Sequence, residues 1–205
     1  MAKIKLTKGE LKKQRDSLRQ FERYLPTLQL KKQQIQMEIL RWNVLLQEKV
    51  ITENTKKLAA HVWAGLLAHE GVEIKKWIAP SQVLKSSKNI AGVDLPVFEQ
   101  AQFPFAEYDL FLVAAWVDNA IESLRELVSL REEIKTIESA REILKTELRI
   151  TTQRVNLFEK VKIPEAEEAI RRIKIYIGDQ MANAVGRSKI AKRKIEELVA
   201  IGEAA

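Results

Sequence analysis

The residues that could do chemistry in this chain are few and poorly spaced for it. Only His61 and His69 remain as soft metal ligands, because the 205-residue sequence contains no cysteine. They lie eight positions apart, whereas two histidines on one helix chelate a metal at i, i+4. The lack of cysteine also excludes a disulfide scaffold, a thiolate zinc site and a cysteine nucleophile. We therefore expect neither a metal site nor a cofactor.

Adjacent carboxylates occur in surroundings typical of a solvated helix face. They stand among basic residues in helical sequence, which gives no reason for the raised pKa that acid–base catalysis needs. The pairs are Glu132–Glu133, Glu167–Glu168 and Glu196–Glu197. None of the seven glycines forms a GxxxxGK[ST] phosphate loop. We therefore predict that the chain is not itself an enzyme.

The composition, with 46% hydrophobic and 31% charged residues, argues against disorder. The longest stretch without a charged residue, 58–69, is about a dozen residues, and a membrane helix needs about 20. No secretory signal is visible, so we expect a cytoplasmic protein.

The net charge of +7 is concentrated at the two ends. Residues 1–35 hold ten Lys and Arg against three acids, and residues 171–205 hold eight against four. A hairpin-shaped chain would bring both basic ends to one tip, which favours an acidic protein surface, nucleic acid or anionic lipid. The alternative is an ordinary Lys-rich helix surface.

The N-terminal segment, 1–71, has the heptad pattern of a coiled-coil helix. Pro26 lies off the apolar seam and is expected to bend the helix there. The seam residues are Leu11, Leu18, Phe21, Leu25, Leu28, Ile35, Ile39, Trp42 and Leu46.

The C-terminal segment, 107–205, repeats the heptad pattern. Pro164 interrupts it, and Ile163 before the proline is biased away from helix. A helical stripe resumes at Ile170 and leads to a basic end. The seam residues are Val113, Trp116, Leu127, Leu130, Ile134, Ile137, Leu144, Leu148, Val155 and Phe158.

The middle segment, 72–106, reads as a small knob that contains a β-hairpin. Strand-like residues occur at 72–74, 83–85 and 93–97. Asn89 and Gly92 lie in the predicted turn, and Pro96 restricts its strand to an edge or a bulge. The fold class is therefore mainly α: a long antiparallel two-helix coiled coil formed by the N- and C-terminal helices, with the hairpin knob in the middle. About the last 30 residues are expected to project past the N-terminus, on a helix rise of about 1.5 Å per residue.

Three runs of sequence resemble one family. They are Tyr24–Lys32 with its Leu-Pro-Thr-Leu, Asn89–Phe98 with its Asn-Ile-Ala-Gly-Val, and Arg154–Glu159 followed by Ile163-Pro164. The whole chain resembles the D subunit of the V-type/A-type rotary ATPases and ATP synthases, the central stalk. The resemblance implies a rotor shaft that transmits torque between the catalytic ring and the membrane rotor, in ATP synthesis and in hydrogen-ion or other ion transport.

The resemblance also implies partners and a location. The partners are the catalytic ring of A- and B-type subunits, the small F subunit of the stalk, and the funnel-shaped subunit that caps the membrane rotor ring. The complex places the protein on the cytoplasmic side, peripheral to the membrane and not inserted in it. We expect the charged tip to contact the ring through Lys3, Lys5, Lys8, Arg187, Lys189, Lys192, Arg193 and Lys194.

Three other functions remain open from the residues alone. A coiled-coil adaptor without a motor would dimerise through its seam. A basic arm that binds nucleic acid would interleave aromatic residues with its cations, whereas the aromatic residues here lie on the seams. A membrane-surface helix at 187–200 would need more apolar residues and an aromatic one.

Overall fold

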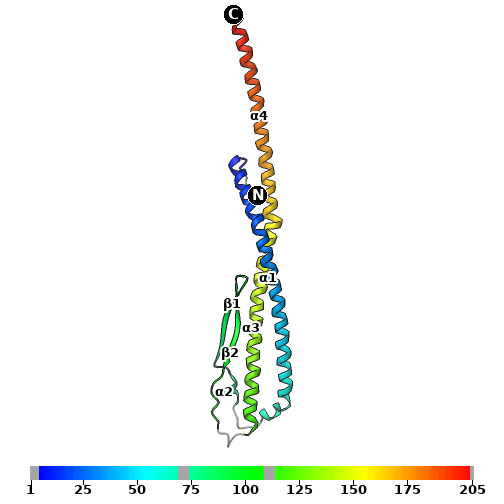
Figure 1. Cartoon of the computed structure of the whole chain (residues 1–205), viewed down its shortest axis with the longest axis vertical. Coiled ribbons are helices and arrows are strands. Elements are labelled where there is room, and N and C mark those ends of the chain that lie inside the picture. Colours follow the sequence, from blue (N-terminus) through cyan, green and yellow to red (C-terminus); the bar gives the residue numbers. More distant parts are fainter. Residues whose placement is uncertain (1–4, 69–73, 109–113, 204–205) are drawn as a thin grey trace. The chain divides into compact units, whose positions relative to one another are not determined.

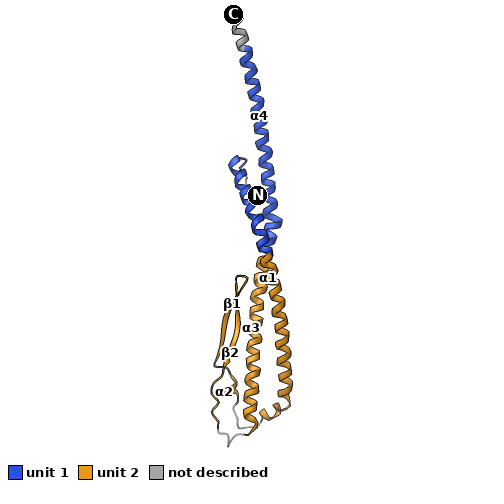
Figure 2. Ribbon diagram, viewed as in Figure 1, with its two compact units in different colours: residues 1–29, 153–205 blue, residues 30–152 orange. Residues whose placement is uncertain are grey.

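A computed structural model describes residues 5–68, 74–108 and 114–203, with side chains as far as Glu197 (Figure 1). Lys3, His69 and Val113 fall outside these ranges. The chain divides into two compact units, one of residues 30–152 and one of residues 1–29 with 153–205 (Figure 2). The elements in order are α1 (Lys8–His61), the 3-10 helix η1 (Ala64–Ala68), α2 (Lys75–Ile78), β1 (Gln82–Ile90), β2 (Val93–Gln102), α3 (Trp116–Leu157), the π-helix η2 (Phe158–Lys162) and α4 (Ile163–Glu203).

In the unit of residues 30–152, α1 and α3 form an antiparallel helix pair. Three ion pairs join them, and residue numbers rise along α1 as they fall along α3. The pairs are Lys31–Glu147 at 2.8 Å, Lys49–Glu133 at 2.8 Å and Lys56–Glu126 at 2.6 Å. This pairing, together with the hairpin between the two helices in sequence, confirms the predicted fold class.

The hairpin of β1 and β2 closes through the two-residue turn Ala91-Gly92. Both turn residues have positive φ, 53° and 75°, as a type I′ turn requires. The Asn89 side chain stabilises the turn: its Oδ1 accepts a bond from the Gly92 amide, and its Nδ2 donates to Asp94 Oδ1 at 2.6 Å. Pro96 is tolerated in β2 because the sheet has only two strands, so each is an edge strand.

The hairpin turn packs against the helix pair and shares its core. Ile35 of α1, Leu95 of β2, and Ala140 and Leu144 of α3 are completely buried together. Ile39, Trp42, Leu148 and the turn-flanking residues Ile90, Ala91 and Val93 cover this cluster. A single core therefore fixes the hairpin to both helices.

A second cluster holds the other end of the hairpin segment to α3. Ile74 packs with Val117 and Ile121. The Arg125 side chain of α3 donates to the carbonyls of Trp77 and Pro104, at 3.0 and 2.6 Å. The guanidinium thereby binds both chain segments that flank the hairpin.

The strand predicted at 72–74 is wrong at its one described residue. Ile74 has helical dihedral angles and precedes the single turn of α2. Its buried side chain packs on α3 rather than in a ladder. Ile74 is apolar and β-branched, as strand residues often are, but here its side chain makes a tertiary contact with α3.

The predicted helix limits also shift. α1 ends at His61 instead of continuing to about residue 71, and α3 begins at Trp116 instead of near residue 107. After His61 the chain turns into η1, which contains Gly65, a poor helix former. Before α3, the ring of Tyr108 lies 5.2 Å from that of Trp77, which fixes this residue against α2.

In the unit of residues 1–29 and 153–205, the start of α1 pairs with η2 and α4 (Figure 2). Thr7 caps α1 by accepting a hydrogen bond from the Glu10 amide. The rings of Phe21 and Phe158 are in contact. α4 then continues past the start of α1 (Figure 2), so the C-terminal extension expected from the sequence is present.

The helix is not broken at Pro164, although the heptad pattern is interrupted just before it, at η2. Ile163 has helical dihedral angles, and its amide donates to the Phe158 carbonyl five residues earlier. A proline lacks an N–H and its ring clashes with the carbonyl four residues back. The wider π turn of η2 accommodates both effects, so the helix continues through the proline.

The π turn also shifts the heptad by one residue. The pattern that includes Val155 and Phe158 predicts inward positions at 162, 165, 169, 172 and 176. The residues that are buried or half-buried with the shifted period are Ile163, Ala166, Ile170, Ile173 and Ile177; of the unshifted positions, only the small residue Ala169 is buried as well. An extra residue in one turn is what a π-helix inserts, and it brings an apolar stripe back to the inner face.

Candidate functional site

The most exposed part of the described chain is the C-terminal half of α4. Ile173 is the last fully buried residue, and from Lys174 to Glu197 every side chain is exposed except half-buried Ile177. Isolated helices gain little stability without packing. This length of bare helix is therefore the candidate interaction surface of the chain.

The predicted cationic cluster lies on this bare helix. All five residues Arg187, Lys189, Lys192, Arg193 and Lys194 are exposed. Lys192 pairs with Glu196 at 3.7 Å, and Arg193 pairs with Glu197 at 3.4 Å. The described residues provide no ion pair for the other three cations.

The N-terminal lysines lie in the same unit but at a different position along α4 from the cationic cluster. Lys5 and Lys8 are exposed at the start of α1. In this unit α1 and α4 run in opposite directions, and Phe21 contacts Phe158 (Figure 2). The first residues of α1 therefore lie near Ile173 of α4, which precedes the cationic cluster by more than ten residues. The structure thus provides two separate basic levels, whereas the sequence analysis predicted one tip.

The predicted seam residues are all buried or half-buried where they are described. Ile35, Ile39 and Trp42 of α1 pack in one cluster with Leu144 and Leu148 of α3. Ile134, Ile137 and Val155 are buried on α3; Leu11, Leu18, Leu25, Leu28, Leu46, Trp116, Leu127 and Leu130 are half-buried. These residues can therefore pack between helices. Val113 lies outside the described residues.

The adjacent carboxylates act as ion-pair partners along the helices. Glu133 pairs with Lys49, and Glu132 pairs with Lys135. Glu168 accepts hydrogen bonds from Arg171 and Arg172, which lower its pKa from about 4.5 to about 2. That direction is opposite to the one a general acid needs. No cluster of three metal-ligating side chains occurs among the described residues.

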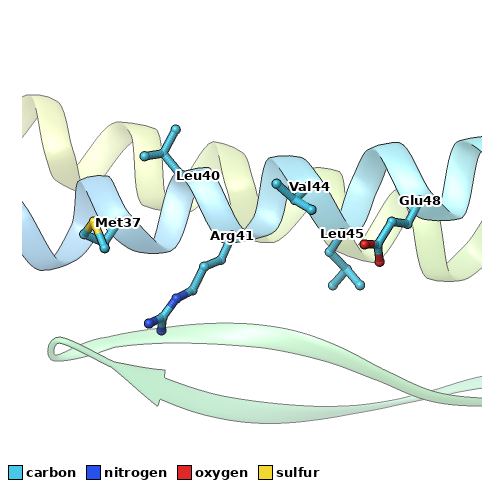
Figure 3. Close-up of a pocket in the computed structure, with 6 residues that line it drawn as sticks. All are labelled: Met37, Leu40, Arg41, Val44, Leu45 and Glu48. Atoms are coloured by element: carbon cyan, nitrogen blue, oxygen red, sulfur yellow. The ribbon is translucent and has the colours of Figure 1, made fainter.

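The sequence analysis missed an apolar surface on α1. Met37, Leu40, Val44 and Leu45 line a shallow groove with Arg41 and Glu48, and in Figure 3 the Arg41 side chain extends toward the hairpin. The signal was present in the sequence, because apolar residues recur every seventh position on the side of the heptad opposite the seam.

Comparison with known proteins identifies the family. Residues 10–193 match the family of the ATP synthase D subunit. The chain belongs to this family. It is 45% identical to the V-type ATP synthase D subunit of Borreliella burgdorferi, over 95% of this chain and 96% of that protein. It is 31% identical to the V-type ATP synthase D subunit of Chlamydia trachomatis, over 96% and 98%.

Family membership confirms the resemblance carried by the Asn-Ile-Ala-Gly-Val and Arg-Val-Asn blocks. The chain is a D subunit, the central-stalk component of a V-type ATP synthase. Nothing in the comparisons favours the coiled-coil adaptor. In the described ranges of this D subunit, no helix is both long and apolar enough to cross a membrane.

Proposed function

We propose that this D subunit is the shaft of the rotary complex and carries torque without doing catalysis itself. Its upper partner is the ring of catalytic A-type and B-type subunits, and at its base it binds the small F subunit of the stalk and the funnel subunit of the membrane rotor. It works on the cytoplasmic side, peripheral to the membrane. It binds neither nucleic acid nor a cofactor.

The bare C-terminal half of α4 carries this proposal. A helix that leaves its own partner after Ile177 and continues to Glu203 must be surrounded by something else to be held in place. A ring with a central opening surrounds a single helix on every side. An adaptor that pairs through its seam would leave this segment uncovered.

The cations suit a contact that has to slide. Charge attraction acts through water and imposes little shape on the two surfaces. Arg187, Lys189 and Lys194 have no ion-pair partner in the described part of the chain and are free to attract acidic side chains of a ring. Lys5 and Lys8 form a second basic level nearer the helix pair.

Torque transmission requires stiffness, and the helix pairs supply it. Knobs-into-holes packing of two helices resists bending more than one helix does. In the unit of residues 30–152, the buried cluster of Ile35, Ala140 and Leu144 with Leu95 of the hairpin braces the pair. The ion pairs Lys31–Glu147 and Lys49–Glu133 fasten its edges.

The test is assembly of the full chain with the ring and stalk subunits of its own organism, followed by native mass spectrometry and coupled ATP hydrolysis and ion pumping. We expect one copy per ring. Truncation after Ile177, which spares every residue that is buried in the described part of the chain, should weaken ring binding. An unbound chain that dimerises would support the adaptor and refute the shaft.

Charge variants refine this test. The triple variant Arg187→Glu, Lys189→Glu, Lys194→Glu should reduce coupling or assembly. The matched control Arg187→Lys, Lys189→Arg, Lys194→Arg keeps the charge and changes the shape, so it should behave like the wild type. Equal pumping by both variants would dispose of the electrostatic contact.

A further inference from the structure

The end of α1 lacks the apolar seam that holds the middle of the helix to α3. Of the two apolar clusters described above, the first includes α1 residues only as far as Trp42, and the second includes none. The first three seam positions of the segment 49–61 carry Lys49, Glu53 and Lys56. This segment therefore docks on α3 largely through charged side chains, and we call it the strap.

Two ion pairs hold the strap to α3, and we call them the latch. Lys49 Nζ lies 2.8 Å from Glu133, and Lys56 Nζ lies 2.6 Å from Glu126. All four side chains are between 24% and 55% exposed, so water and dissolved ions reach them. Ion pairs in such positions contribute little stability, and salt screens them. The latch is therefore weak, and its strength depends on the ionic strength.

The buried carboxylate of Glu53 makes docking of the strap costlier. Its side chain is only 12% exposed, and its ion pair is with Lys57 of the strap itself, at 2.7 Å. Removing a charge from water costs free energy, which attraction to a half-exposed partner offsets only in part. If the strap opened, Glu53 would return to water and keep its partner, because both residues lie on the same segment.

The local sequence of the strap also gives a weak helix. Residues 50–55, Val-Ile-Thr-Glu-Asn-Thr, contain only one good helix former, Glu53. The hydroxyls of Thr52 and Thr55 donate to the carbonyls four residues earlier, each at 2.9 Å. Such bonds compete with the helical backbone and slightly destabilise it. The strap thus combines a polar seam, a buried charge and low helix propensity.

We propose that the strap opens from α3 as one unit, at a lower free energy than the rest of the helix pair, and that the latch makes this opening depend on salt. Segments with few apolar contacts open separately from a packed core in this way. Opening leaves the buried cluster of Ile35 and Leu144 intact. It uncovers the seam face of α3 at Leu127 and Leu130, which lie between the two acids of the latch. This conformational change goes beyond the proposed function and does not depend on it.

Hydrogen exchange of the full chain, followed by mass spectrometry at low and high NaCl, tests the proposal. Residues 31–46 of α1, which have an apolar seam, are the internal control. Between about 0.1 M and about 1 M NaCl, exchange in the strap should become about fivefold faster, and exchange in the control less than about 1.5-fold faster. The response should begin in one step after residue 46. Ordinary fraying would instead give a gradient inward from residue 61, with no dependence on salt.

Two double variants separate the latch from the rest of the strap. Lys49→Met with Lys56→Met gives the strap an apolar seam, so exchange should be slower than in the wild type and no longer depend on salt. Lys49→Glu with Lys56→Glu places like charges opposite the acids of α3, so the strap should be open at both salt concentrations. Lys145→Met is the matched control, because Lys145 pairs with Glu142 of its own helix, and it should leave the strap unchanged.

Three results would overturn the inference. One is an equal salt response in the strap and in residues 31–46 of the wild type. The second is a graded exchange profile without a step after residue 46, which would show fraying instead of a unit. The third is a wild-type salt response in the Met double variant, which would show that the latch does not control the opening.

Discussion

The rings of Phe21 and Phe158 lie with their centroids 5.3 Å apart and their planes tilted by 48°. Phe158 is the first residue of the π-helix η2, so this contact fixes α1 against the chain at the point where the heptad shifts. Tilted aromatic pairs at this distance add stability beyond the area that they bury.

Truncating either ring should destabilise the chain. Because both residues are half-buried, Phe21→Ala and Phe158→Ala should each lower the free energy of unfolding by about 2 kcal/mol. The double variant should reveal a coupling of about 1 kcal/mol between the rings. Urea unfolding of the four chains measures it, and strictly additive losses would show that the contact contributes nothing of its own.

Arg125 should be required for holding the hairpin segment on α3. Arg125→Ala leaves the carbonyls of Trp77 and Pro104 without their donor and should cost about 2 kcal/mol. Arg125→Lys should restore little of that, because a single ammonium cannot reproduce the guanidinium fork. Arg131→Ala, at an exposed site on the same helix, is the control for urea midpoints and should change stability by less than about 0.5 kcal/mol.

Two glycines provide a matched test of backbone strain. A Cβ at Gly92 or at Gly178 would meet nothing within 4 Å, but only Gly92 has a positive φ. Gly92→Ala should therefore destabilise the chain by about 1 kcal/mol, while Gly178→Ala, inside α4, should stabilise its helix by up to about 1 kcal/mol. Thermal unfolding followed by circular dichroism measures the change in Tm of each variant. If both substitutions raised the Tm, or both lowered it, the assignment of the turn would be contradicted.

Glu168 should make stability depend on pH in the acid range. Its two arginine partners lower its pKa from about 4.5 to about 2, so the folded chain binds fewer protons there than the unfolded chain. The stabilising contribution is complete above about pH 4.5 and is lost as the pH falls toward 2. The Tm difference between the wild type and Glu168→Gln should therefore close between pH 6 and pH 2. A difference that stays constant would show that the carboxylate charge is irrelevant.

Heptad spacing predicted the antiparallel helix pair because apolar residues at that period leave a long helix few other ways to bury them. The hairpin turn was also predictable, since Asn89 and Gly92 are residue types suited to it. The details that failed depend on tertiary contacts. Ile74 looks like a strand residue by itself, and only its packing on Val117 and Ile121 makes it part of a helical turn.

The candidate site was predictable in part for the same reason. The basic residues at 187–194 can be recognised from the sequence alone. Their distance along the unit from Lys5 and Lys8 depends on how α1 pairs with α4, which the sequence does not show. The apolar surface of Met37, Leu40, Val44 and Leu45 was not predicted, because the seam already accounted for one apolar stripe on α1.

The π turn at Phe158–Lys162 gives this long helix one place where its length can change. In an ordinary coiled coil, inserting or deleting one residue rotates every later side chain by about 100° away from the seam. Here one residue is already accommodated as a wider turn, so losing it would join the two stripes into one unbroken heptad, a change that the ring of Pro164 would oppose. Insertions and deletions in related chains are therefore expected to collect at this turn and to be rare in the helices on either side of it.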